Sequence, residues 1–223
     1  MEIKKIASIT AVIMMLAMNA GAKPVESELV TKYLEAVDSK NALKMSAIIK
    51  ENKDKIPAEI KTLLDAAAKP DITPEDKESK LYIAELLASG LKEETGDFTL
   101  LKEVKKAVFN SKLTAVPVRP KAENGIHVVM TTHVMVKSDT TEEAKNMFLP
   151  DNIIIKKGET VRWENKDAVA HVLISMPVIG TGGIKATRIE PGASFEFKFD
   201  KPGEYFYICY IHKGMVGKVT VEE

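Results

Sequence analysis

The spacing of the apolar residues changes about halfway along the chain. From residue 23 to about residue 115, apolar side chains recur every three to four positions, which is the period of a helix that buries one face. From Ile126 onwards apolar and polar residues alternate, which is the period of a strand with one buried face. The sequence therefore predicts an α + β chain with the two classes in separate domains, a small helical bundle followed by a β-sandwich.

The first domain, residues 23–115, is predicted to form a bundle of four or five short helices. One helix start is well marked, because Thr73 suits the N-cap, Pro74 suits the first turn, and two acidic residues follow at the positive end of the helix dipole. We expect this helix to end at Gly90, since glycine is common just past a helix C-terminus.

A stretch with two prolines separates the predicted domains. Pro117 and Pro120 each push the preceding residue toward extended backbone, so no helix continues through this segment. The sequence therefore predicts a linker at residues 116–124 and a second domain at residues 125–223. About 100 residues is a usual size for one β-sandwich.

Short runs of period two, with turn residues between them, predict the strands of the second domain. Phe195, Phe197 and Phe199 alternate with charged residues, and Pro202 begins a turn before the next run. The predicted strands are Ile126–Val136, Asn152–Ile155, Thr160–Trp163, Phe195–Phe199, Glu204–Cys209 and Val216–Val221.

The first predicted strand carries two of the four histidines, His127 and His133. Six residues of strand separate them by roughly 20 Å, which argues against a shared ion. Alternation puts both histidines on the same face as Val129. The opposite face, which includes Val128 and Met130, is more apolar. We therefore expect this opposite face to be the core side and the histidines to be exposed.

The first 22 residues have the pattern of a secretory signal peptide. Lys4 and Lys5 precede an apolar stretch, Ile6–Ala17, and small residues lead to a cleavage position after Ala22. The stretch is short for a membrane-spanning helix, which needs about 20 residues, so cleavage is favoured over an uncleaved anchor. No later segment is long and apolar enough to span. The sequence therefore predicts a periplasmic or otherwise extracytoplasmic protein without a membrane span after cleavage.

Charge and cysteine content narrow the function classes. The chain has 32 basic and 32 acidic residues, so no basic excess points to a nucleic acid partner. The single cysteine, Cys209, cannot form an internal disulfide, and a free exposed thiol is a liability after export. Either Cys209 is buried and inert, or a bound metal protects it.

Four residues form the candidate metal site: His171, Cys209, His212 and Met215. The last three make a C-x2-H-x2-M run in the turn between the last two predicted strands, and His171 must arrive from a different strand. Two imidazoles, one thiolate and a weak thioether are the donor set of a mononuclear copper site that transfers electrons. The sequence therefore predicts one copper ion and no catalytic residues.

The segments around these donors resemble a known family. Pro202–Met215 is similar to the ligand loop of the cupredoxins, the small blue copper proteins, and its short spacing is most similar to amicyanin and plastocyanin. Ile153–Trp163 resembles the strand pair of that family, and His171 falls where its first ligand lies. The resemblance covers residues 126–223 and does not extend to the helical domain.

The resemblance implies a Greek-key β-sandwich that binds copper and carries single electrons between redox partners, without being an enzyme. His171, Cys209 and His212 would be the strong ligands, Met215 the axial ligand, and the edge of His212 the exit for electrons. Two positions depart from the family pattern, since Val172 stands where asparagine is common and Lys213 adds a charge beside the ligand. Both positions affect the reduction potential and the fine geometry of the site.

The loop Met176–Gly180 has two interpretations. It is either a buried loop or an apolar docking patch for redox proteins beside His212. Small interfaces suffice for weak redox encounters, so a modest patch would be enough.

Two other functions remain open at this point. Copper storage, delivery or sensing would need more donors, and Met130, His133 and Met135 give this thin support. A copper enzyme would need a second site with more histidines, which His127 and His133 could supply only at an oligomer interface. The role of the helical domain, the redox partner and the oligomeric state do not follow from the sequence.

Overall fold

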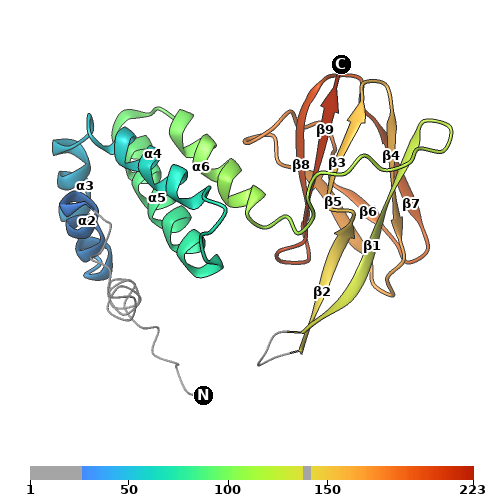
Figure 1. Cartoon of the computed structure of the whole chain (residues 1–223), viewed down its shortest axis with the longest axis horizontal. Helices are drawn as coiled ribbons and strands as arrows, with labels where there is room; N and C mark the ends of the chain where they lie inside the picture. Colours follow the sequence, from blue (N-terminus) through green and yellow to red (C-terminus); the bar gives the residue numbers. More distant parts are fainter. Residues whose placement is uncertain (1–26, 138–141) are drawn as a thin grey trace. The chain divides into compact units, whose positions relative to one another are not determined.

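The computed structural model describes residues 27–137 and 142–223, with side chains outside residues 133–146 (Figure 1). The predicted signal peptide, residues 1–22, lies outside the described residues. The described chain divides into two compact units, one ending at Val108 and the other beginning at Phe109. The first unit is helical and the second is built of strands, which confirms the predicted fold class.

The helical unit contains five described helices, in agreement with the prediction of four or five. Its core is formed by the faces that the apolar period predicts, including Tyr33, Ile60 and Leu87. None of the described helices combines the length and the apolar character that crossing a membrane requires. The helices are α2 (Glu28–Asp38), α3 (Ala42–Glu51), α4 (Ile56–Ala67), α5 (Pro74–Thr95) and α6 (Thr99–Asn110).

Helix α5 begins where the sequence predicts and ends later. The side chain of Thr73 accepts a hydrogen bond from the backbone amide of Asp76, as an N-cap does. The expected end at Gly90 is wrong, because the helix continues to Thr95 and its C-cap is Gly96 in the left-handed conformation. A Cβ at position 90 would lie 2.9 Å from Tyr33 Oη, so glycine is needed there for close helix packing.

The second unit is a sandwich of two sheets. One sheet has the strand order β2-β1-β4-β7, and the other has the order β3-β9-β8-β5-β6. The pairs β1–β4 and β3–β9 are parallel, and the other neighbours are antiparallel. The strands are β1 (Ile126–Lys137), β2 (Glu142–Leu149), β3 (Asn152–Lys156), β4 (Thr160–Asn165), β5 (His171–Ser175), β6 (Thr187–Ile189), β7 (Ser194–Lys198), β8 (Gly203–Cys209) and β9 (Val216–Glu222).

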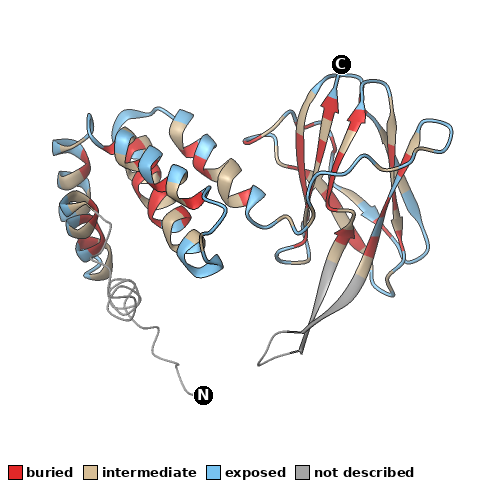
Figure 2. Cartoon of the chain, viewed as in Figure 1, coloured by how far each residue is buried: buried red, intermediate tan, exposed pale blue. Residues whose placement is uncertain are grey.

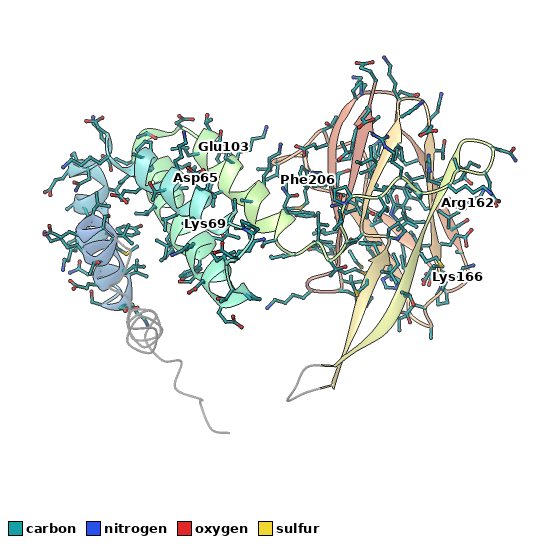
Figure 3. The ribbon with its side chains drawn as sticks, in the orientation of Figure 1. Asp65, Lys69, Glu103, Arg162, Lys166 and Phe206 are labelled. Atoms are coloured by element: carbon teal, nitrogen blue, oxygen red, sulfur yellow. The ribbon has the colours of Figure 1, made fainter. Side chains whose placement is uncertain are left out.

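The sandwich core contains several aromatic side chains that are fully buried. Trp163 from β4 and Tyr207 from β8 meet edge to face with ring centroids 5.3 Å apart, and the Phe148 and Tyr207 ring centroids are 4.9 Å apart. Figure 2 shows that buried residues run along the strands while most loops are exposed. Arg162 and Lys166, labelled in Figure 3, carry the outer charges of β4 and of the loop after it.

The buried face of β1 is the opposite of the one expected. His127 is 4% exposed and lies on the core side with Val129 and Thr131, whereas Val128 and Met130 are 37% and 42% exposed. The two-residue alternation is correct, but the buried and exposed faces were interchanged, because polar side chains that find hydrogen-bond partners can be buried. His127 Nδ1 lies 3.1 Å from the carbonyl oxygen of Pro120, and Nε2 lies 2.9 Å from a carboxylate oxygen of Glu159. The side chain of His133 is outside the described part.

Glu159 links β1 to the turn before β4, and its charge should stabilise the sandwich. Burial alone would raise the pKa of Glu159, but hydrogen bonds from the Lys156 amide and from His127, with the charges of both residues, outweigh burial and lower it. A lowered folded-state pKa means that the contribution is present above the ordinary carboxyl range and is lost as the pH falls through the folded-state pKa.

We expect Glu159→Gln to lower the free energy of unfolding by about 1.5–3 kcal/mol at pH 7, since hydrogen bonds to charged groups contribute this much. The difference from the wild type should shrink as the pH falls through the folded-state pKa of Glu159 and vanish below it. Urea unfolding at several pH values measures this. Glu190→Gln is the control, because the Glu190 side chain is 59% exposed. A difference that does not change with pH would contradict the role of the Glu159 charge.

The chain before β1 is held against the sandwich. Asp151 is 2% exposed, and its carboxylate accepts hydrogen bonds from the backbone amides of Thr114 and Ala115, at 2.6 and 3.1 Å. Val118, inside the predicted linker, forms a parallel bridge with Ile153 of β3. A buried carboxylate needs such donors, so this attachment is part of the stability of the β unit.

Candidate metal centre

Two neighbouring strands and one turn bring the predicted donors together. His171 is the first residue of β5, and Cys209 is the last residue of β8. These strands are antiparallel neighbours in register Leu173↔Cys209, so both residues lie at the same end of the sheet. His212 and Met215 follow Cys209 in the turn that leads to β9. His171 therefore opens a strand of its own, in the sheet opposite β4.

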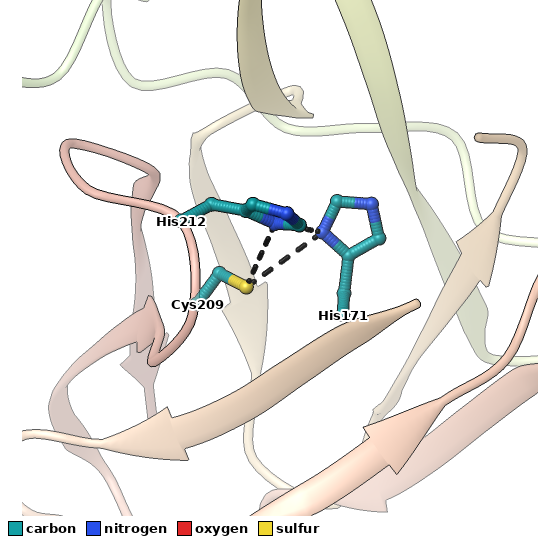
Figure 4. Close-up of side chains that lie close together, drawn as sticks. All are labelled: His171, Cys209 and His212. Atoms are coloured by element: carbon teal, nitrogen blue, oxygen red, sulfur yellow. Dashed lines mark hydrogen bonds between the residues drawn. The ribbon is translucent and has the colours of Figure 1, made fainter. Parts of the chain in front are cut away.

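Three donor atoms converge at this end of the sandwich (Figure 4). Cys209 Sγ lies 3.7 Å from His171 Nδ1 and 3.4 Å from His212 Nδ1, and the two Nδ1 atoms are 3.0 Å apart. Ligands at the metal distances known for zinc, about 2.0–2.3 Å, would lie roughly 3.5–3.8 Å apart in a trigonal plane. The observed separations are within about 0.6 Å of that arrangement.

A compact turn positions His212 and Met215. The Cys209 amide donates to the Met215 carbonyl oxygen at 3.0 Å, and the Met215 amide donates to the His212 carbonyl oxygen at 3.3 Å. Gly214 has φ +83°, a conformation that favours glycine. Met215 is 1% exposed and lies in the same core cluster as Cys209. The turn therefore holds Met215 next to Cys209 through a backbone hydrogen bond.

The backbone of Val172 ties the two ligand segments together. Its amide lies 3.4 Å from Cys209 Sγ as a donor, and its carbonyl oxygen accepts from the Tyr210 amide at 2.7 Å. Both groups belong to the main chain. The two segments are therefore joined although valine stands where the family commonly has asparagine.

The site is buried except at one ligand. Cys209 is 3% exposed and His171 is 0% exposed, whereas His212 is half-buried. Burial, and then the nearby charge of His212, lower the pKa of His171, while Asp167 acts in the opposite direction. A lowered pKa keeps the His171 imidazole neutral near pH 7, which is the form that binds a metal.

The donor chemistry fits a copper ion better than a purely structural role. Two Nδ1 atoms and a sulfur face one another, and two facing Nδ1 atoms cannot both carry a proton at 3.0 Å. A cation between them would satisfy all three acceptors at once. A set of two imidazoles and a thiolate with a nearby thioether is characteristic of electron-transfer copper sites.

Comparison with known proteins agrees with this donor set. Residues 133–222 match the model of the family described as copper binding proteins, plastocyanin/azurin family. Plastocyanin from Scenedesmus fuscus is 34% identical over 85 residues, a match that spans 34% of this chain and 87% of that protein. The chain belongs to the plastocyanin/azurin family. This membership rests on the β unit, since the helical unit lies outside the match.

Two further relatives are matched over a smaller share of their length. The match spans 59% of chloroplastic plastocyanin from Tetradesmus obliquus, at 35% identity, and 60% of amicyanin from Paracoccus versutus, at 32% identity. Among solved structures, a purple cupredoxin from Nitrosopumilus maritimus is 28% identical, with a TM-score of 0.35, and the alignment covers 43% of this chain and 98% of that one.

The loop Met176–Gly180 lies away from His212 in this cupredoxin. Ser175 pairs with Tyr207, and the Met176 amide donates to the Phe206 carbonyl oxygen at 2.7 Å, so Met176–Gly180 runs beside the start of β8 while Cys209 is at its end. Ile179 is 2% exposed and packs against Phe206. The interpretation of this loop as an apolar docking patch beside His212 is therefore wrong. The alternative of a buried loop holds for Ile179.

Sequence reasoning missed one residue beside the site. Asp167 Oδ2 lies 3.4 Å from His171 Nε2, the ring nitrogen that faces away from Cys209. Its position four residues before His171 was a usable signal, because ligand histidines commonly pair their second nitrogen with a carboxylate or a carbonyl oxygen.

Proposed function

We propose that this cupredoxin is an exported carrier of single electrons that holds one copper ion. The ligands would be His171, Cys209 and His212, with Met215 as the weak axial ligand. A copper ion bound there would supply a one-electron redox couple. The observation that carries the proposal is the convergence of three donor atoms, two from paired strands, at one end of a plastocyanin-like sandwich.

The protein's part in this function is to hold the donors still. Electron exchange is fast when the ligands need not move between oxidation states, and rigid elements fix ligands better than free loops. His171 and Cys209 lie on hydrogen-bonded neighbouring strands. The Val172 amide donates to Cys209 Sγ, and its carbonyl oxygen accepts from the Tyr210 amide. These contacts favour a carrier over a site that opens to exchange its ion.

The half-buried imidazole of His212 is the proposed exit for electrons. Exposed apolar side chains occur in both segments that carry ligands: Tyr210 is 73%, Ile211 48% and Val169 46% exposed. Ile208, the residue before Cys209 in β8, instead packs against the hydrophobic cluster of Phe109, Ile179 and Phe206. We therefore place the docking surface for redox proteins at the turn after Cys209, with Lys213 as its charge.

Export is part of the proposal. Cys209 is a free and buried thiol, and a bound metal would protect it in an oxidising compartment. The signal-peptide pattern at residues 1–22 supports a periplasmic or otherwise extracytoplasmic location. We propose no chemical transformation of a substrate, because three of the four ligands are buried and only His212 reaches the surface.

Copper titration of the metal-free protein tests this function. We expect one ion per chain and intense visible absorption, because a thiolate ligand to Cu(II) gives strong charge-transfer bands. Met215→Leu should keep the absorption and the 1:1 stoichiometry, since the thioether is the weak ligand. A colourless protein that binds only Cu(I) would instead indicate storage or delivery. More than one tightly bound ion per chain would favour the copper-enzyme alternative.

A further inference from the structure

A buried carboxylate faces the back of the His171 ring. Nδ1 of His171 points toward Cys209 and His212, so Nε2 lies on the opposite side of the imidazole. Asp167 Oδ2 is 3.4 Å from this Nε2, and the two side chains are 1% and 9% exposed. Bulk water therefore does not serve either atom, and each must find its partner inside the protein.

Neither atom has a hydrogen-bond partner among the described residues. An unpaired buried polar group destabilises the folded protein, so two such groups that face each other gain by forming a hydrogen bond. The separation is about 0.4–0.5 Å longer than a usual N–H···O distance.

The carboxylate is fixed by a network around Asn165. The Asp167 amide donates to Asn165 Oδ1 at 2.9 Å, and the Asn165 side-chain amide donates to the carbonyl oxygens of Val169 and Ile189 at 2.8 and 3.0 Å. Asp167 Oδ1 accepts from the Ala168 amide at 2.7 Å. One carboxylate oxygen is thus used to hold the loop, and the other remains aimed at the ring.

We propose that Asp167 is a positioning residue for His171, whose carboxylate accepts a hydrogen bond from Nε2–H in the copper-loaded protein. That bond fixes the tautomer, so that Nδ1 carries no proton and presents its lone pair to the metal. The negative charge behind the ring makes the imidazole a stronger donor and favours Cu(II) over Cu(I). This inference rests on the proposed function, because it requires copper at His171.

Asp167→Asn tests the proposal by removing the charge at nearly constant size. Loss of such a partner lowers metal affinity about 10–100-fold, and we expect the loss to be larger for Cu(II) than for Cu(I). A tenfold difference between the two losses raises the reduction potential by about 59 mV. Competition titrations and potentiometry measure both quantities.

Glu164→Gln is the matched control. Glu164 lies three residues away, and its carboxylate pairs with Lys166 at 2.8 Å on the outer side of the sheet instead of with the ring. The control removes the same charge without touching His171, so we expect its shift to be much smaller. Equal shifts in the two variants would overturn the proposal, because they would reflect net charge alone.

A second measurement needs no variant. In the Cu(I)-loaded wild type, which is diamagnetic, proton NMR should show a slowly exchanging, downfield Nε2–H signal from His171. An Nε2–H that exchanges with water as fast as an exposed imidazole would overturn the hydrogen bond. If the wild type binds copper but these results fail, only the role of Asp167 falls. If it binds no copper, the proposed function falls as well.

Discussion

Replacing Cys209 with serine is expected to abolish the intense visible absorption of the copper-loaded protein. A hydroxyl is a poor copper ligand at neutral pH, and the charge-transfer bands require the thiolate sulfur. Cu(II) affinity should fall by more than about 100-fold, because losing an outer partner of a ligand already costs up to that much. Absorption spectra and competition titrations measure the two effects.

Ile211→Ser is the control for this substitution. It places the same residue in the same turn, but the Ile211 side chain is 48% exposed and offers no donor atom. We expect its spectrum and stoichiometry to match those of the wild type. Retention of the absorption in Cys209→Ser would show that the colour comes from other donors, and the proposed ligand set would be wrong.

Gly217→Ala should destabilise the β unit by about 3 kcal/mol, the upper part of the range for overpacking a closed core. Gly217 is buried in β9, and a Cβ there would come closer than 3.0 Å to ring atoms of Tyr207. The Tyr207 ring cannot retreat, because Trp163 and Phe148 contact it and it is fully buried. Urea unfolding of the full chain, followed by tryptophan fluorescence from Trp163, measures the loss.

A double-mutant cycle identifies the cause. In a Tyr207→Leu background the ring is absent, so adding Ala at position 217 should cost less than about 1 kcal/mol. A cost that stays the same in both backgrounds would place the strain in the backbone instead of in the contact with Tyr207. The cycle thus tests the aromatic packing that holds β8, the strand that ends at Cys209.

The candidate site could be predicted because its information is local in the sequence. Cys209, His212 and Met215 lie within seven residues, and a turn between two strands brings such a run together. His171 could be named as a second imidazole donor, but the short strand β5 that positions it was not predicted, because its sequence has no marked alternation. The helix start at Thr73 was equally local, because its hydrogen bond spans only three residues.

The features that were predicted wrongly depend on contacts between distant residues. His127 is buried because its two ring nitrogens find polar partners in the Pro120 carbonyl oxygen and the Glu159 carboxylate, and neither partner is visible in the pattern of β1. Gly90 looked like a helix end, but it is the point where Tyr33 approaches α5. The sequence left two interpretations open for the loop after Ser175, and strand pairing decides between them, because it takes the loop to the end of β8 opposite Cys209.

Asp167 shows the same limit in the site itself. Its distance from His171 in the sequence was compatible with a role, but nothing in the sequence shows that the carboxylate is buried and aimed at Nε2. The network of Asn165 that fixes it joins β4 to the loop and to Ile189. Only the folded chain brings these groups together.

A spectroelectrochemical titration of the copper-loaded full chain tests whether this protein is a reversible electron carrier. We expect a single reversible one-electron couple at one copper per chain, with visible absorption that disappears on reduction and returns fully on reoxidation. The copper should remain bound throughout, because His171 and Cys209 lie on paired strands and do not move apart. Release of copper on reduction, or the absence of a reversible couple, would contradict the assignment of this protein as an electron carrier.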